Sequence, residues 1–183
     1  MTPTLYFLRS SEQKIVTDML HFSARLYEVG KTLDDVAELD MYNKFYGLTT
    51  KDLGLYALVG HKIAGAVWLR ELKKENGANA YVDDKTPVLN IAVKPEFRGQ
   101  GIGSAMLEQL FLEAGALYKQ ISVSILNNER TLNYFEKFGF TKLEGSNGKS
   151  PVDGSEVITM IKSISNEAVT RPSDGYDPQR WMD

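Results

Sequence analysis

The stretch "VLNIAVKPEFRGQGIGSAMLEQLF", from Val88 to Phe111, joins an apolar run to an amphipathic run through three closely spaced glycines. Its first six residues are typical of a strand, and the apolar positions after Gly103 recur at helical spacing. The first N–H groups of such a helix have no intrahelical partner, and the helix dipole adds partial positive charge there. Gly99, Gly101 and Gly103 let the backbone approach an anion closely. The stretch therefore predicts a phosphate-binding loop, with Arg98 as a fixed charge at its rim.

Several glycine-rich loops bind phosphate, and the spacing separates them. The Gly-Lys-Ser/Thr ending of a P-loop is absent from the sequence. The dinucleotide pattern G-x-G-x-x-G is met at Gly99 and Gly101 but has Ser104 in its last position, which disfavours a nicotinamide or flavin site. A purely structural turn with incidental glycines is the remaining alternative.

The flanking sequence predicts a mixed α/β fold. The expected elements are a strand at 4–9, helices at 10–30 and 32–47, a hairpin at 53–72, an exposed loop at 73–86, a strand at 121–126, a helix from Asn128 to Gly139, and strands at 140–144 and 156–163. Gly60-His61-Lys62 marks the hairpin turn, Ser10 followed by Gln13 resembles a capping box, and Thr32 with Asp35 marks the start of the second helix. The order indicates antiparallel strands followed by one strand–helix–strand crossover.

Composition limits the class of protein. The 183 residues are 43% hydrophobic and 25% charged, which fits one globular domain. A net charge of −3 argues against a general nucleic-acid binder. Zero cysteines exclude disulfides and thiolate chemistry and favour a reducing compartment. We see neither a secretory leader nor an apolar run of roughly 20 residues, so we expect a cytoplasmic protein that does not enter the membrane.

Neither the two histidines nor the C-terminal tail has a motif that indicates a metal site or an enzyme centre. His21 and His61 lack the spacing of metal ligands, so no metal site is expected. The segment 165–183 is polar and contains Pro172 and Pro178, which predicts an extended arm. Its Tyr176 and Trp181 are candidates for docking, and the tail either completes a homodimer or trails in solvent.

Two motifs together resemble one family. The run from Arg98 to Gly103 fits R/Q-x-x-G-x-G/A, the pyrophosphate loop of the GNAT acyltransferase superfamily, and "NERTLNYFEKFGF" (Asn128–Phe140) is similar to a later segment of that family. The resemblance implies an α/β (α+β) GNAT fold over residues 1–164. Such a fold has a mixed central sheet of about six to seven strands, splayed at the cofactor site and flanked by about four helices. Residues 165–183 would be an extension.

The resemblance also implies acetyl-CoA as co-substrate and assigns residues to it. Main-chain groups of Ile91, Ala92 and Val93 would pair with the pantetheine arm. The pyrophosphate would lie on the amides of Gly99, Gln100, Gly101, Ile102, Gly103 and Ser104, next to Arg98. Asn128 would meet the pantetheine arm, with helix capping as the alternative role. Lys137 would reach the nucleotide phosphates, unless it is simply a solvated lysine.

The sequence assigns the catalytic groups less completely than the cofactor contacts. The family often places a tyrosine four residues before the glycine of its Gly-Phe pair, and this sequence has Phe135 there. Tyr134, its neighbour, is therefore our candidate general acid for the leaving thiolate, with an ordinary half-buried aromatic as the alternative. The general base is unassigned: Glu71, Asp83 and Asp84 are either bases acting through water or surface charges.

Three functions follow from these patterns. The first is an N-acetyltransferase that transfers acetyl from acetyl-CoA to a primary amine of a small molecule or peptide. The second is a non-catalytic acyl-CoA-binding regulatory module of the same fold, which Phe135 keeps open. The third is a nucleotide-binding redox protein, which Ser104 disfavours. The acidic segment 34–40 is either a wall that attracts a cationic amine or a solvated face.

Overall fold

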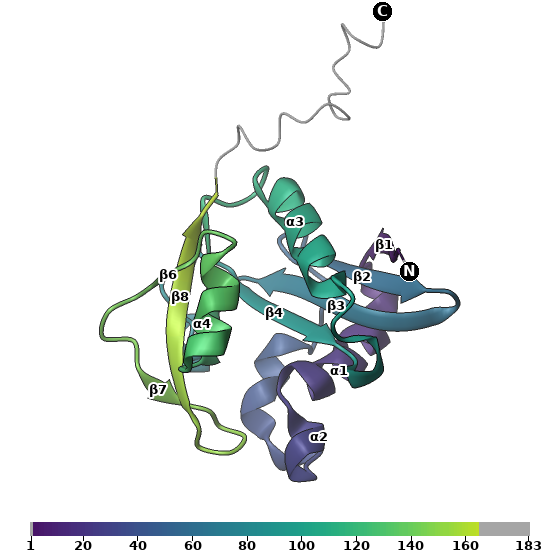
Figure 1. Ribbon diagram of the computed structural model, residues 1–183. Helices are drawn as coiled ribbons and strands as arrows, with labels where there is room; N and C mark the ends of the chain where they lie inside the picture. Colours follow the sequence, from purple (N-terminus) through teal and green to yellow (C-terminus); the bar gives the residue numbers. More distant parts are fainter. Residues whose placement is uncertain (1, 165–183) are drawn as a thin grey trace, which may run out of the picture.

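Eight strands form one mixed sheet in the computed structural model, which describes residues 2–164 (Figure 1). They are β1 (Thr4–Phe7), β2 (Leu53–Val59), β3 (Lys62–Arg70), β4 (Val88–Val93), β5 (Gln120–Leu126), β6 (Thr141–Lys142), β7 (Gly148–Lys149) and β8 (Glu156–Ser163). Their order is β1-β2-β3-β4-β5-β8-β6, and β7 pairs with β8 off this path. The pairs are antiparallel except for β4 with β5. The sheet thus confirms the mixed fold and its single crossover. The strand expected at 140–144 is present as the shorter β6, and β7 is an additional short strand.

Helices cover both faces of this sheet. They are α1 (Gln13–Ser23), α2 (Leu26–Val29), α3 (Ile102–Ala114) and α4 (Glu129–Glu136). Alternate residues of β3 point to opposite faces: Val67 and Leu69 join the core under α3, whereas Ala66 and Trp68 join the core under α1. The sheet therefore separates an α3–α4 side from an α1–α2 side (Figure 1). The described residues contain no helix long and apolar enough to span a bilayer.

The N-terminal helices are more broken than the sequence pattern predicts. The expected helix at 10–30 is interrupted by Arg25, whose φ of 59° is left-handed, and α2 follows it. The expected helix at 32–47 is a pair of 3-10 turns, although Asp35 does accept a hydrogen bond from the Thr32 N–H at 2.8 Å. The Trp68 indole donates to the Tyr42 carbonyl, and Arg70 donates to the Lys44 carbonyl. Side chains of β3 therefore take carbonyls that an α-helix would use internally.

The loop at 73–86 is less exposed than we expected. Ala80 is 0% exposed and Thr86 is 2% exposed. The Ser122 hydroxyl donates to the Ala80 carbonyl at 2.7 Å, and the Thr159 hydroxyl donates to the Asn79 carbonyl at 2.9 Å. Sheet hydroxyls thus hold this polar segment against β5 and β8.

The tail lies outside the described residues. The predicted extension at 165–183, with Tyr176 and Trp181, follows β8 in the sequence. Its predicted roles, as an extended arm or in a homodimer, stay predictions.

Candidate active site

The parallel strands β4 and β5 separate immediately after they meet. Within the described residues, their register consists of one pair, Val88 with Ser122, whereas β5 pairs with β8 along its whole length. A cavity of about 310 Å³ opens where they diverge. Leu89, Asn90 and Ile91 line it from β4, and Ser124 and Ile125 line it from β5. This splayed gap is the one that the sequence resemblance predicted.

The glycine loop leads from β4 into α3. Gly99 and Gly101 have φ values of 77° and 80°, which favour glycine, and a Cβ at either would meet only open space. Gly101 is the N-cap of α3. Within residues 2–164, none of the backbone N–H groups of residues 101–104 donates a hydrogen bond. Free donors at a helix N-terminus have the geometry that anion binding requires.

Gly103 is the most crowded of the three glycines. A Cβ there would lie 3.1 Å from the Tyr134 hydroxyl and 3.6 Å from side-chain atoms of Ile91 and Val93. The first turn of α3 therefore packs closely against β4 and α4. Glycine at this position allows that close approach, since a Cβ would crowd the Tyr134 hydroxyl.

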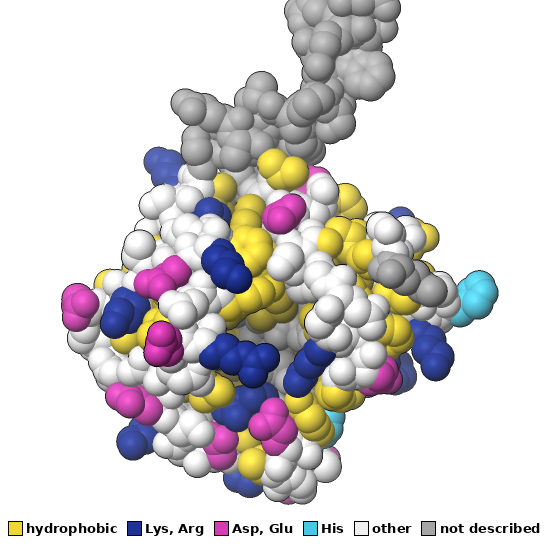
Figure 2. Space-filling model, viewed as in Figure 1, with side chains coloured by type: hydrophobic (Ala, Val, Ile, Leu, Met, Phe, Trp, Pro, Cys, Tyr) yellow, Lys and Arg dark blue, Asp and Glu magenta, His cyan; other side chains and the backbone are white. Residues whose placement is uncertain are grey.

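Three cations surround a second hollow, between the loop and α4. Arg98, Arg130 and Lys137 line this open pocket of about 650 Å³ together with Thr131, Asn133 and Tyr134. Figure 2 shows Lys and Arg side chains gathered around a hollow on this face. Arg130 was missed in the sequence analysis. Its helical spacing from Tyr134 and Lys137, four and seven residues on, places all three on one face of α4 and was the signal that could have found it.

Arg98 is oriented by neighbours on both sides. Its Nε donates to the Val93 carbonyl at 3.1 Å, and its guanidinium carbon lies 5.7 Å from the centre of the Tyr27 ring. Because the side chain is held at the end of β4, its charge stays at the rim of the loop. This is the position that the sequence predicted for it.

Asn128 begins α4. Its side-chain oxygen accepts a hydrogen bond from the Thr131 N–H at 2.9 Å, which confirms the capping alternative. We expect Asn128→Ala to reduce the free energy of unfolding by about 1 kcal/mol, because this N–H loses its partner. Chemical denaturation measures the change. Asn128→Asp keeps the cap and serves as the control; an equal loss in both variants would contradict the capping role.

Tyr134 and Phe135 face different spaces. The Tyr134 hydroxyl lies 3.5 Å from Ser104 Oγ, on the side of the glycine loop and the three cations. Phe135 is 5% exposed, packs edge-on against Phe140 with ring centres 5.5 Å apart, and lines the cavity between β4 and β5. The phenol therefore points toward the loop, and the phenyl ring borders the splayed gap.

The carboxylates considered as general bases are not among the residues that line this cavity. Asp84 accepts a hydrogen bond from the Tyr81 hydroxyl at 2.6 Å, and Asp83 accepts one from the Lys85 N–H. Glu71 lines a separate hollow with Asp84. These acids sit at the far end of β3 and in the loop before β4.

The acidic residues of segment 34–40 do not line the cavity either. Asp35 caps its own turn, and Asp40 pairs with Lys44 at 3.1 Å. The cavity is lined instead by Leu39 and Tyr42 from this part of the chain. Burial raises the pKa of Tyr42 to about 12, so its phenol stays neutral at working pH.

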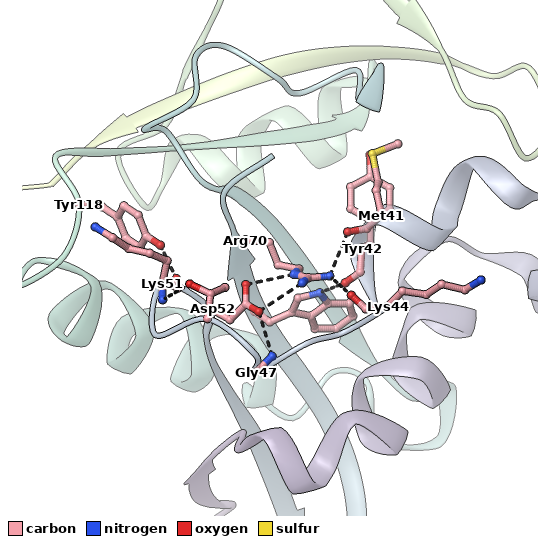
Figure 3. Close-up of polar contacts among 10 residues, drawn as sticks. Met41, Tyr42, Lys44, Gly47, Lys51, Asp52, Arg70 and Tyr118 are labelled. Carbon is pink, nitrogen blue, oxygen red and sulfur yellow. Dashed lines mark hydrogen bonds and ion pairs between the residues drawn. The ribbon is translucent and has the colours of Figure 1, made fainter. Parts of the chain in front are cut away.

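A buried ion pair fixes the segment that carries Tyr42. Asp52 is 2% exposed in its side chain and forms a two-pronged contact with Arg70, with Nε 3.0 Å from Oδ1 and a second nitrogen 3.2 Å from Oδ2 (Figure 3). Arg70 also donates to the Met41 and Lys44 carbonyls, and Asp52 accepts from the Gly47 N–H. The pair thus ties the whole segment 41–52 to the end of β3.

Comparison with known proteins identifies the family. Residues 52–142 match the family model described as the acetyltransferase (GNAT) domain. A GNAT-family acetyltransferase from Streptococcus pneumoniae has a similar structure, with a TM-score of 0.64 and 16% identity over 90% of this chain and 100% of that one. Among curated protein sequences, none matches the chain significantly.

Two further similar structures contain acetyl-CoA. One is a GNAT-family acetyltransferase from Elizabethkingia anophelis, with a TM-score of 0.56 and 19% identity over 88% of this chain and 98% of that one. The other is a GNAT-superfamily phosphinothricin acetyltransferase from Sinorhizobium meliloti, with a TM-score of 0.60 and 15% identity over 90% of each chain. The sheet, its helices and the splayed strands are those of the GNAT acetyltransferase fold. The chain belongs to the GNAT acetyltransferase family.

Proposed function

We propose that this protein is an acetyl-CoA-dependent N-acetyltransferase that acts on a primary amine of a small molecule or peptide. The observation that carries the proposal is the set of free N–H groups at residues 101–104 in the first turn of α3, where Gly103 lies close to Ile91, a residue that lines the cavity between β4 and β5. A diphosphate on the loop would leave the acyl arm free to enter that cavity. Similar folds with acetyl-CoA bound support this choice of co-substrate.

The cofactor contacts in this proposal follow the geometry. The amides of Gly99, Gln100, Gly101, Ile102, Gly103 and Ser104 would hold the diphosphate. Arg98, Arg130 and Lys137 would supply its counter-charge, and main-chain groups of Ile91, Ala92 and Val93 would pair with the pantetheine arm. Asn128 contributes to the cofactor site mainly by starting α4 at this place.

The chemistry is a direct attack in a ternary complex. The amine nitrogen attacks the thioester carbonyl, a C–N bond forms, and the C–S bond then breaks with departure of the CoA thiolate. The nitrogen loses one proton, and the thiolate takes up one. N–H groups of β4 near Ala92 are the candidate donors to the oxyanion. Holding both reactants in one cavity supplies much of the rate through proximity.

Domain extent and location complete the proposal. We assign residues 1–164 to the acetyltransferase domain and residues 165–183 to a C-terminal extension. A cytoplasmic location agrees with a sequence that contains zero cysteines.

Thiol release from acetyl-CoA, measured across a panel of primary amines, tests the proposed function. We expect amine-dependent release, and calorimetry with CoA should show binding without any amine. The competing function is a non-catalytic acyl-CoA-binding module, which Phe135 favours because a ring without a hydroxyl lines the cavity. Tight CoA binding with no release for any amine would support that module.

We propose that the hydroxyl of Tyr134, on α4, contacts the cofactor. We expect Tyr134→Phe to weaken acetyl-CoA binding about 10-fold, which corresponds to the loss of roughly one hydrogen bond. Steady-state kinetics separate two roles: a cofactor contact raises KM, whereas a proton donor to the thiolate lowers kcat by about 10²-fold or more. Tyr6→Phe, an exposed tyrosine on β1, is the control.

The cation cluster gives a salt-dependent prediction. We expect Arg130→Gln to raise the Kd for CoA about 10-fold at low ionic strength, because a charged hydrogen bond to phosphate is lost. The difference should shrink as salt screens the remaining charges. Isothermal calorimetry at two salt concentrations measures it. Arg9→Gln, at the opposite end of the sheet, should bind CoA like the parent; no effect of Arg130→Gln would remove it from the site.

A further inference from the structure

The strand β1 forms an edge of the sheet, and β2 is its one partner strand in the described part of the chain (Figure 1). The Leu8 N–H donates to the Gly54 carbonyl at 2.8 Å, directly after β1. Because an antiparallel ladder alternates, the N–H and C=O groups of Tyr6 also face β2, whereas those of Leu5 and Phe7 face outward. Among the described residues, none bonds to these outward groups. β1 therefore presents two donors and two acceptors at a free edge.

This edge is apolar and carries no charge. Tyr6 and Phe7 are 45% and 49% exposed, and residues 2–8 contain no charged side chain. Edge strands that stay unpaired commonly carry lysine or another charge, which prevents pairing with a second chain. The short strands near the other end of the sheet follow this rule, with Lys142 in β6 and Lys149 in β7. β1 lacks this protection.

More exposed apolar side chains lie near the end of β1. Gly47 packs against Ser10, and Phe45 and Leu48 on either side of this glycine are 67% and 75% exposed. Together with the two aromatic residues of β1, they make four of the six large apolar side chains that are exposed among residues 2–164. Exposed apolar surface is thus concentrated at this edge, as is typical of an interaction surface.

The free edge is complementary to itself. When two copies of β1 pair antiparallel about a two-fold axis at Tyr6, Leu5 of each copy lies opposite Phe7 of the other. The outward N–H and C=O groups of these residues then form four hydrogen bonds between the copies. All the free backbone groups of the strand are used in this arrangement.

The residues on either side of the strand select this register. Moving the axis toward the N-terminus brings Pro3 into the ladder, and proline has no N–H to donate. Moving the axis toward the C-terminus brings in Arg9, whose N–H donates to the Glu12 carboxylate at 2.9 Å and whose carbonyl accepts from the Glu12 N–H. Either shift would lose hydrogen bonds, so the axis at Tyr6 is favoured.

The side chains fit the same register on both faces. On the α1–α2 side, the Tyr6 ring stacks on Tyr56 of β2, with ring centres 5.5 Å apart. Tyr6 of the second copy would be its next neighbour, so four tyrosines would form one row across both sheets. On the α3–α4 side, a hollow of about 330 Å³ is lined by Leu5, Phe7 and Gln109. Phe7 of the second copy would enter this hollow opposite Leu5.

We infer that the protein forms a symmetric homodimer in which the two β1 strands pair antiparallel and join both sheets into one. This inference goes beyond the proposed function and does not depend on acetyl transfer. At about 200 Å² per aromatic side chain, the exposed parts of Tyr6 and Phe7 from two copies amount to roughly 400 Å². Interfaces below about 1,200 Å² belong to weak, reversible complexes. We therefore expect a Kd of about 10–100 µM.

Sedimentation velocity of the full chain over about 1–500 µM, on either side of that Kd, tests the dimer. We expect the mass to rise from one chain toward two. Tyr6→Lys would place two ammonium groups side by side on the axis and should raise the Kd at least about 100-fold. Val29→Lys is the matched control, because Val29 is a 40% exposed apolar residue on α2; it should dimerise like the parent.

Thiol cross-linking tests the register. The sequence contains zero cysteines, so a single introduced thiol forms a disulfide with a second copy. Tyr6→Cys places two thiols in a directly opposed, non-hydrogen-bonded pair with Cα atoms about 4.5 Å apart, which suits a disulfide. Thr4→Cys lies on the same face, but its two thiols would be about 14 Å apart. Under mild oxidation, we expect Tyr6→Cys to cross-link at least 10-fold faster, and equal rates would overturn the register.

Three other results would overturn the inference. One is a parent chain that stays single at every concentration, and another is a dimer that a folded Tyr6→Lys protein retains, since its interface would lie elsewhere. The third concerns amide exchange in a single chain. If the N–H groups of Leu5 and Phe7 were protected there, and lost protection when residues 165–183 were removed, that segment would be the occupant of the edge.

Discussion

Replacing Gly101 with glutamate is expected to raise the Kd for acetyl-CoA at least 100-fold, about 2.7 kcal/mol or more. The new carboxylate would stand beside the free N–H groups of residues 101–104, where the diphosphate is proposed to bind. Like charges repel strongly in such a confined site. The left-handed φ of 80° at Gly101 also strains any side chain there. Calorimetry with CoA measures the loss, and amine-dependent thiol release should fall with it.

The control for this variant is Gly60→Glu, in the turn between β2 and β3. Gly60 has a φ of 65° and open space around it, so the substitution adds the same charge with a similar backbone strain. It should lower stability by a comparable amount and leave the Kd for CoA unchanged. Normal CoA binding by a folded Gly101→Glu protein would contradict the proposed diphosphate site.

Replacing Asp52 with asparagine is expected to lower the free energy of unfolding by about 3–5 kcal/mol, because the buried Arg70 guanidinium is left without its counter-charge. In a domain of this size, that corresponds to a fall in Tm of roughly 10 °C. Thermal and chemical denaturation measure the change. The same variant should raise KM for the acceptor more than the Kd for CoA, since Arg70 also holds the segment that carries Tyr42.

Asp18→Asn is the matched control for the buried pair. Asp18 forms an exposed ion pair with Lys14 at 2.9 Å, and such pairs contribute about 0–1 kcal/mol. If both asparagine variants unfolded at the same denaturant concentration, the pair between Asp52 and Arg70 would not be what fixes segment 41–52.

The local sequence predicted much of the structure around the glycine loop. The glycine loop and the start of α3 lie where the sequence predicted them, and Asn128 caps α4 as one of its two predicted roles. Each depends on a few neighbouring residues: a glycine that tolerates positive φ, or a carboxamide that accepts from an N–H three residues on. Arg130 was missed although its helical spacing from Lys137 was readable.

The secondary-structure predictions that were wrong failed because of contacts with residues far away in the sequence. The helix expected at 32–47 fails because Trp68 and Arg70 take the carbonyls of Tyr42 and Lys44 from a strand that comes later in the chain. The loop around Ala80 is buried because Ser122 on β5 binds its carbonyl. Periodicity within a segment contains no information about such partners.

The sequence by itself determined the shape of the glycine-rich loop, because that shape arises from backbone preferences within a short segment, and its motifs were enough to indicate the family. Only the tertiary structure decided that β5 pairs with β8 and leaves β4 after one shared pair, and so opens the cavity. It also decided that Phe135 lines this cavity and that Tyr134 faces the loop. Strand partners and cavity walls depend on competition between residues far apart in the chain, which no local pattern records.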